Sequence, residues 1–166
     1  MLDGAQASIE IYTGCGKGKS TAAFGLAMRM AGCGGRAFIL QFRKAKRCGE
    51  HISAEKLGIP VRQCLIGRVG EKCAGPCCLM QEARRILREE KPDLLVLDEI
   101  MAALRAGCVT LCEVSALLDE AGGAEIVMTG RSAPQELTAR AGLVTEMKKI
   151  KHFYDDGLPA RRGIEY

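Results

Sequence analysis

The stretch "TGCGKGKST" (residues 13–21) lies between a β-rich segment, "SIEIY", and an alanine-rich segment, "AAFGLAMRM". Phosphate-binding loops usually lie at such a place, because they follow a strand and begin a helix. The common pattern is G-x-x-x-x-G-K-[ST]. Here Thr13 stands where the first glycine belongs. The stretch predicts an anion-binding turn, and its altered start leaves open which reaction it serves.

The loop is rich in residues that attract phosphate. Glycines allow the backbone N–H groups to turn toward an anion, and the N-terminus of the following helix adds partial positive charge. Lysines add full charges, and a serine hydroxyl after the second lysine can bind Mg2+. The alternative is a glycine-rich turn without a ligand. The candidate ATP-binding residues are Gly14, Cys15, Gly16, Lys17, Gly18, Lys19, Ser20 and Thr21.

Apolar runs alternate with helical patterns along the whole chain. Short strands are expected at 8–13, 36–42, 60–65, 93–99, 124–130 and 143–147, and helices at 19–32, 78–90, 110–123 and 133–142. Several strands are almost entirely apolar, as in sheets that are covered on both faces. The pattern predicts a three-layer α/β fold with a mainly parallel sheet of about six strands, similar to the P-loop NTPases of the RecA-like type.

Length and composition predict a single domain spanning 1–166, and we expect the protein in the cytoplasm. The chain has 48% hydrophobic and 27% charged residues, which is typical of a globular protein. A net charge of +4, with four Phe, three Tyr and no Trp, does not favour nucleic-acid binding. The start "MLDGAQAS" has no signal-peptide pattern, and no apolar run has the length of a membrane span. Neither nucleic acid nor membrane is therefore expected as a partner.

Three further stretches should lie beside the loop, because ligands of open α/β sheets bind outside the carboxyl ends of the strands. "LLVLDE" ends in Asp98 and Glu99, which could hold Mg2+ with Ser20 or simply cap a helix. Arg131, in "TGR", should point into the same mouth. "RKAKR" (43–47) could be a solvated face or could contact a triphosphate or the polar rim of a second ligand.

These motifs together resemble the ATP:corrinoid adenosyltransferases, from about Ile9 to Tyr166. The resemblance lies in the order and spacing of "YTGCGKGKSTAAFGLAMRMAGCG", "FILQFRKAKRCGE", "PDLLVLDEIMAAL", "IVMTGRSAPQEL" and "VTEMKKIKHFYDDGLPARRGIEY". It implies a reaction in which reduced cobalt attacks C5′ of ATP and expels triphosphate. Lys17, Lys19 and Glu99 are then the candidate catalytic residues, because they would stabilise the charge of the leaving group with Mg2+. A homodimer and an electron donor such as a flavoprotein are also implied.

The reaction implied by the resemblance needs no general base, since cobalt is the nucleophile. The two histidines, His51 and His152, are therefore expected to have surface or structural roles.

The chain departs from this family around residues 64–78. Related enzymes often carry a "G-F-x-W" pattern after the third strand, whose aromatics resemble a wedge against the lower ligand of cobalt; here the stretch reads Gly67-Arg68-Val69-Gly70. Related enzymes also often have an N-terminal segment that covers the site of a neighbouring subunit. Here about seven residues precede the first strand, so the presence of such a lid is in question.

Cysteines stand in place of the wedge. The chain has nine cysteines, an odd number without a signal peptide, which favours reduced thiols. Cys64, Cys73, Cys77 and Cys78 could hold zinc or an iron–sulfur cluster, but burial as small apolar side chains is favoured. The alternative function is an ATP-binding relative with a metal or redox loop that has lost corrinoid transfer. An ordinary ATPase is a third reading.

Overall fold

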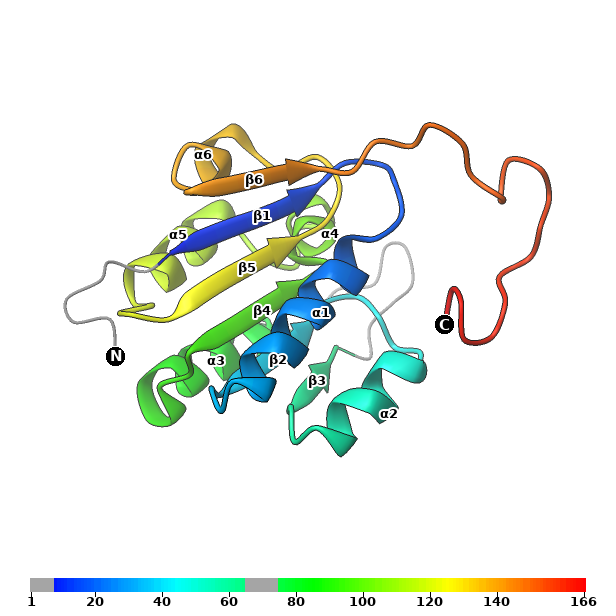
Figure 1. Cartoon of the computed structure of the whole chain (residues 1–166). Helices are drawn as coiled ribbons and strands as arrows, with labels where there is room; N and C mark the ends of the chain where they lie inside the picture. Colours follow the sequence, from blue (N-terminus) through cyan, green and yellow to red (C-terminus); the bar gives the residue numbers. More distant parts are fainter. Residues whose placement is uncertain (1–7, 65–74) are drawn as a thin grey trace.

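A computed structural model of the chain describes residues 8–64 and 75–166 (Figure 1). The stretch Gly67–Gly70 and Cys73, discussed above, lie outside these described residues. In chain order the elements are β1 Ile9–Thr13, α1 Lys19–Gly32, β2 Ala37–Gln41, α2 Gly49–Lys56, β3 Val61–Gln63, α3 Cys78–Arg85, the π-helix η1 Ile86–Glu90, β4 Leu94–Asp98, α4 Ile100–Arg105, α5 Leu111–Asp119, β5 Glu125–Thr129, α6 Gln135–Thr138 and β6 Leu143–Glu146.

The six strands form one sheet in the order β3-β2-β4-β5-β1-β6. Every strand pair in it is parallel, so the predicted sheet is confirmed and each predicted strand is present within a residue or two of its expected ends. Strand β1, which leads into α1, and strand β4 lie two places apart in this order, with β5 between them. In a sheet of this kind the loops that leave the carboxyl ends meet at one edge, where a ligand can be held.

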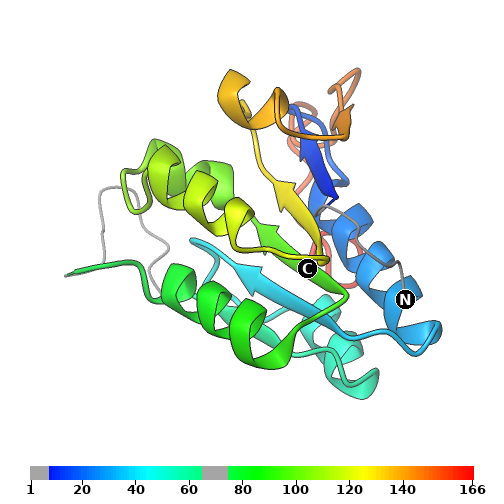
Figure 2. The same cartoon turned by 90° about the vertical axis from the view of Figure 1, so that its left-hand side faces the viewer.

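Two hydrophobic cores cover the two faces of the sheet. Helices α1 and α2 lie on one face, and α3 to α6 lie on the other (Figures 1 and 2). Strand β4 contributes side chains to both cores, because successive side chains of a strand point to opposite faces of the sheet. Leu94 and Val96 pack with Ala23 and Ala27 of α1, whereas Leu95 and Leu97 pack in the other core. The fully buried strand explains the unbroken apolar run in the sequence.

The predicted helices differ in length from those observed. The helix at 19–32 is confirmed at both ends, whereas the predicted helix at 78–90 is α-helical only to Arg85 and continues as a π-helix. Helices α5 and α6 are shorter than expected. Helices α2 and α4 were not predicted as elements, because α2 has little apolar periodicity and α4 has only six residues.

Gly130 follows β5 at a place where two parts of the backbone approach closely. Its φ is +140°, a conformation that side chains rarely adopt, and an added Cβ would lie 2.6 Å from Cβ of Met101 in α4. This contact sets α4 against the end of β5, and so places Arg131 and Glu99 at the same edge of the sheet.

We therefore predict that Gly130→Ala lowers the free energy of unfolding by about 2 kcal/mol or more, because the methyl group overpacks Met101 and strains the backbone. Urea unfolding measures the change. Gly25→Ala is the matched control: Gly25 lies within α1 with nothing within 4 Å of its added Cβ, and the variant should gain about 0.5–1 kcal/mol. Equal stability of the two variants would contradict the assigned contact.

Candidate active site

A cavity of about 270 Å³ opens at the carboxyl edge of the sheet, between the loop after β1 and the C-terminal tail (147–166). Charged and polar side chains from distant parts of the chain meet there. Its lining consists of Cys15, Gly16, Lys17, Gly18, Lys19, Ser20, Thr21, Lys44, Glu50, Glu99, Arg131, His152, Ile164 and Glu165. Most predicted site residues are thus brought together, whereas Gly14 and Asp98 are not among the lining residues.

Two of the loop glycines are required by the tail that leaves β6. A Cβ on Gly14 would lie 2.5 Å from the carbonyl oxygen of Met147, and one on Gly16 would lie 2.7 Å from it. The Gly16 N–H also donates to that oxygen, at 2.6 Å. The Gly16 N–H would therefore have to leave the carbonyl oxygen of Met147 before it could face an anion. The first turn of α1 still presents N–H groups that lack intrahelical acceptors.

Lys19 is buried at the base of the cavity. Its Nζ donates to the carbonyl oxygen of Gly16 at 2.6 Å, so the loop itself holds the ammonium group. Burial lowers the pKa of Lys19, and the nearby carboxylate of Glu99 opposes this effect. A phosphate group that displaced the Gly16 carbonyl oxygen would contact the Lys19 ammonium group, whose full positive charge is poorly solvated.

Asp98 is fully buried behind the cavity, and both of its carboxylate oxygens accept hydrogen bonds. Gln41 Nε2 donates to Oδ2 at 2.8 Å, and Thr129 Oγ1 donates to Oδ1 at 2.6 Å. Thr129 in turn accepts the N–H of Glu99 at 2.9 Å. Each carboxylate oxygen thus already has a hydrogen-bond donor, and Asp98, one of the predicted Mg2+ ligands, does not line the cavity. The geometry favours a positioning role for Asp98.

Glu99, unlike Asp98, lines the cavity. Its backbone has φ 60°, an uncommon value for a residue with a side chain, at the junction between β4 and α4. Burial raises the pKa of Glu99, with a smaller contribution from the charge of Asp98, while Lys19 and Lys44 act in the opposite direction. A cation beside this half-buried carboxylate would favour its charged form.

The basic stretch 43–47 divides its side chains among several partners. Only Lys44 of this stretch lines the cavity. Lys46 lies 3.7 Å from the ring centroid of Tyr166, Arg47 pairs with Glu55 at 2.5 Å, and Arg43 donates to Cys108 Sγ at 3.3 Å. Most of the run thus makes structural contacts. Arg131 lines the cavity, as expected, and its backbone oxygen accepts a hydrogen bond from Arg105.

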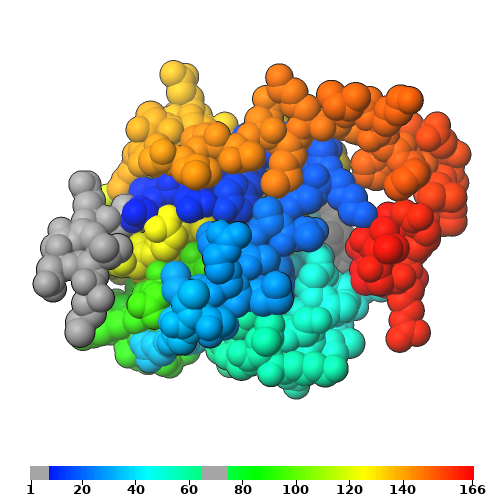
Figure 3. Space-filling model, in the orientation of Figure 1, coloured from blue at the N-terminus to red at the C-terminus, as the bar shows by residue number. Residues whose placement is uncertain are grey.

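The tail closes one side of the cavity, which the sequence reasoning did not foresee. Figures 1 and 3 show it running from β6 past the loop to the vicinity of α2. Lys17 Nζ donates to the Ile164 carbonyl oxygen and to Glu165 Oε1, both at 3.1 Å. His152 also lines the cavity, although only a surface or structural role was expected for it. The resemblance included the tail motif, but no spacing rule placed it against the loop.

A second, mostly apolar cavity of about 520 Å³ adjoins the first, between α1, α2 and the end of the tail. The two cavities share Thr21, Glu50, Ile164 and Glu165. The charged mouth and the apolar hollow therefore offer neighbouring places for the polar and apolar parts of ligands.

Of the described cysteines of the atypical loop, two are buried in the packing and Cys78 is exposed. Cys64 and Cys77 are buried in the core beneath α3 to α6, and Cys78 begins α3. In residues 8–64 and 75–166, the one group of three potential metal ligands whose donor atoms converge is Cys48, Glu50 and His51, not this set. A search of the same residues finds no helix that is long and apolar enough to cross a membrane.

Fold and site define an α/β protein with a lysine-rich, glycine-rich loop after its first strand. Residues 5–166 match the family described as ATP:corrinoid adenosyltransferase BtuR/CobO/CobP. The chain is 33% identical to corrinoid adenosyltransferase CobA of Salmonella typhimurium, over 95% of this chain and 85% of the relative. It is 35% identical to a corrinoid adenosyltransferase of a Sinorhizobium species, over 95% and 79%, and 30% identical to that of Pseudomonas aeruginosa, over 94% and 82%. The chain belongs to the ATP:corrinoid adenosyltransferase family.

We predict that Glu165→Gln loosens the tail, because Glu165 accepts hydrogen bonds from Lys17 and from the Arg161 backbone and side chain. Trypsin at neutral pH should cleave the variant faster after Arg161 and Arg162. Glu136→Gln, at an exposed position on α6, should leave the rate unchanged.

The same contacts predict how pH affects the tail. They lower the pKa of Glu165 from 4.5 to about 2, chiefly through the Arg161 side chain. Its contribution is therefore fully present above about pH 4.5 and is lost as pH falls toward 2. The protection of the 161–166 amides, which is the intrinsic hydrogen-exchange rate divided by the observed rate at the same pH, should fall as pH decreases over that interval; protection that does not change with pH would contradict the assigned contacts.

Proposed function

We propose that this chain transfers the 5′-deoxyadenosyl group of ATP to the reduced cobalt of a corrinoid and releases triphosphate, in the synthesis or salvage of adenosylcobalamin. The observation that carries the proposal is the convergence of Lys17, Lys19, Lys44 and Arg131 on one cavity at the head of α1, in a chain of this family. Four cationic side chains beside a helix N-terminus suit a polyphosphate.

The phosphate end of ATP would displace contacts that the protein now makes with itself. Lys19 is held by the Gly16 carbonyl, and Lys17 is held by Ile164 and Glu165. Phosphate oxygens are stronger acceptors for ammonium groups than a neutral carbonyl. Binding would therefore turn these two lysines toward the substrate, where they stabilise negative charge.

Ser20 and Glu99 fit a magnesium ion. Both line the cavity, both offer oxygen ligands, and Mg2+ prefers oxygen. A bound ion would neutralise phosphate charge and, like Lys19 and Lys44, would favour the charged form of Glu99 against the effect of its burial. Asp98 would hold the strand end in place through Thr129 and Gln41.

The chemistry assigned to the side chains is electrostatic. The bond formed joins cobalt to C5′, and the bond broken joins C5′ to the triphosphate oxygen, so charge accumulates on the leaving group. The residues of the cavity need not remove a proton; they stabilise that charge in a partly enclosed site. His152 would therefore contribute to substrate binding or to the shape of the cavity, and not to proton transfer. By analogy with the family, two copies of the chain and a reductase such as a flavoprotein would complete the system.

The decisive experiment is anaerobic incubation with ATP, Mg2+ and chemically pre-reduced cob(I)alamin. Formation of adenosylcobalamin together with inorganic triphosphate supports the proposal. Release of ADP and phosphate without an adenosylated corrinoid would identify an ATPase instead.

Lys19→Ala should lower the rate of adenosyl transfer by about 100-fold or more, because a buried positive charge facing the leaving group is lost. Lys46→Ala is the matched control, since Lys46 contacts Tyr166 and does not line the cavity. Transfer by the Lys19 variant at a rate near that of the unaltered chain would overturn the assigned role.

Glu99→Gln and Asp98→Asn should separate metal binding from positioning. Glu99→Gln should raise the Mg2+ concentration for half-maximal activity on the order of tenfold or more with unchanged stability. Asp98→Asn should lower the free energy of unfolding by about 1–3 kcal/mol, because an amide N–H₂ would face the buried donors Gln41 and Thr129. Mg2+ titration and urea unfolding measure the two effects. The reverse pattern would make Asp98 the ligand.

A further inference from the structure

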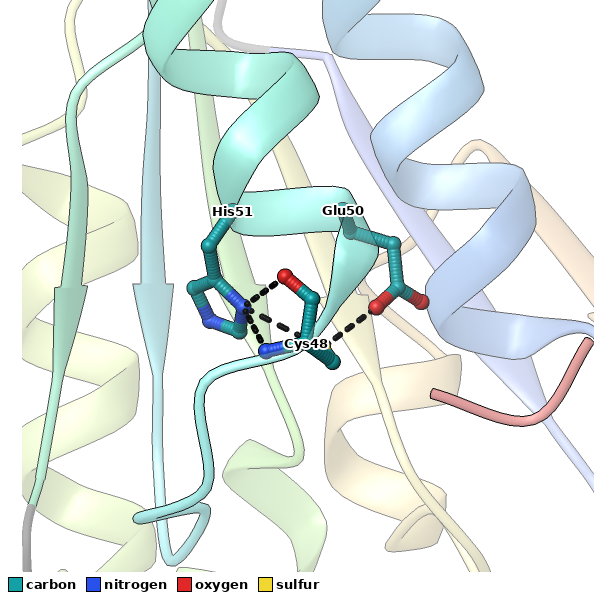
Figure 4. A group of neighbouring side chains, drawn as sticks. All are labelled: Cys48, Glu50 and His51. Carbon is teal, nitrogen blue, oxygen red and sulfur yellow. Dashed lines mark hydrogen bonds between the residues drawn. The ribbon is translucent and has the colours of Figure 1, made fainter. Parts of the chain in front are cut away.

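Three potential metal ligands converge at the N-terminus of α2, apart from the proposed Mg2+ site. They are the Cys48 thiol, the Glu50 carboxylate and the His51 imidazole (Figure 4). Their donor atoms all lie within 4.8 Å of one another. Cys48 and His51 are buried, and Glu50 is half-buried.

The surrounding hydrogen bonds set the protonation of the imidazole. Gln41 donates through Nε2 to Asp98, so its Oε1 is an acceptor, and His51 Nε2 lies 2.6 Å from that oxygen. The imidazole proton therefore belongs on Nε2, and the lone pair belongs on Nδ1. Burial lowers the pKa of His51, which favours this neutral form. Metal-binding histidines are commonly oriented in this way, by a hydrogen bond from the other ring nitrogen.

The thiol proton occupies the centre of the group. Cys48 Sγ donates to Glu50 Oε2 at 2.5 Å and lies 3.1 Å from His51 Nδ1. Burial raises the pKa of the Cys48 thiol, and Glu50 adds to this effect. A carboxylate, a sulfur atom and a nitrogen lone pair thus surround a single proton. A metal ion in its place would compensate two negative charges at once.

We propose that Cys48, Glu50 and His51 bind a divalent transition metal of the zinc class. Sulfur, nitrogen and carboxylate oxygen together form a donor set typical of Zn2+. On binding, the Cys48 S–H bond breaks, the sulfur keeps the electron pair and bonds to the metal, and the proton leaves to solvent. Glu50 also lines the nucleotide cavity, so water from that side would complete four-coordination.

Two local features oppose binding and set its strength. His51 Nδ1 now accepts the Cys48 backbone N–H at 3.0 Å, and the metal must displace that bond. Lys44 and Arg47 place positive charge nearby, although Arg47 is already paired with Glu55. Selectivity should therefore come from the thiolate, which favours zinc-class ions over Mg2+.

The site does not depend on the proposed function. None of its ligands has been assigned to phosphate, and Cys64, Cys77 and Cys78 are not part of it. Metal binding can therefore be measured without ATP or corrinoid.

The test is an anaerobic titration of the full chain with Co2+ alone, with thiols kept reduced by a phosphine, followed by displacement with Zn2+. We expect one equivalent of Co2+ to give an absorption band of thiolate-to-metal charge transfer, which Zn2+ abolishes. Cys48→Ser should lose this band. Cys33→Ser, which removes an exposed thiol after α1, should keep it. A band retained in Cys48→Ser, or no band in the unaltered chain, would overturn the proposal.

A second variant avoids dependence on the buried thiol. Glu50→Gln alters a half-buried residue, and circular dichroism should show an intact fold. Its affinity for Co2+ should fall about tenfold or more, whereas Glu136→Gln, at an exposed position on α6, should bind as the unaltered chain does. Equal affinities for the two variants would exclude Glu50 as a ligand and refute the three-residue site.

Discussion

The carboxylate of Asp98 holds together the edge of the sheet at which the site forms. A buried charge is costly unless it is hydrogen-bonded, and Asp98 accepts one bond from β2 through Gln41 and one from β5 through Thr129. Those bonds join three neighbouring strands at their carboxyl ends. The network continues beyond Asp98, because Thr129 accepts a hydrogen bond from the Glu99 N–H and Gln41 Oε1 accepts one from His51 Nε2 of α2. The cavity and the cluster at α2 thus both depend on this one buried carboxylate.

The second constraint is the close approach of the chain that leaves β6. Met147 continues the β1–β6 pairing beyond the strands and occupies the Gly16 N–H, so the backbone there has no room for a Cβ. Glycines that would ordinarily be explained by phosphate binding are in this chain also explained by packing. The loop and the tail form one structural unit, and the shape of the cavity depends on both.

The two lysines of the loop are held by groups of the protein itself. Lys19 is held by a loop carbonyl and Lys17 by the tail carboxylate of Glu165, while Glu99 lies near Lys19 and Lys44. Lys17 and Lys19 thus each have a partner within the protein. A polyphosphate offers stronger acceptors to the same groups. The site suits stabilisation of a departing anion, which is the task that adenosyl transfer from ATP requires.

Local pattern in the sequence determined the strands, the parallel sheet, the loop before α1 and the family. These follow from apolar runs, from glycine and lysine spacing, and from strand-to-helix order, which are all properties of neighbouring residues. Tertiary structure decided that Asp98 is bonded to Gln41 and does not line the cavity, that Lys44 alone of the 43–47 run lines it, and that His152, Ile164 and Glu165 line it too. It also brought Gln41 to His51. Such contacts join residues far apart in the chain, and their partners are chosen by burial and hydrogen bonding after the sheet has formed.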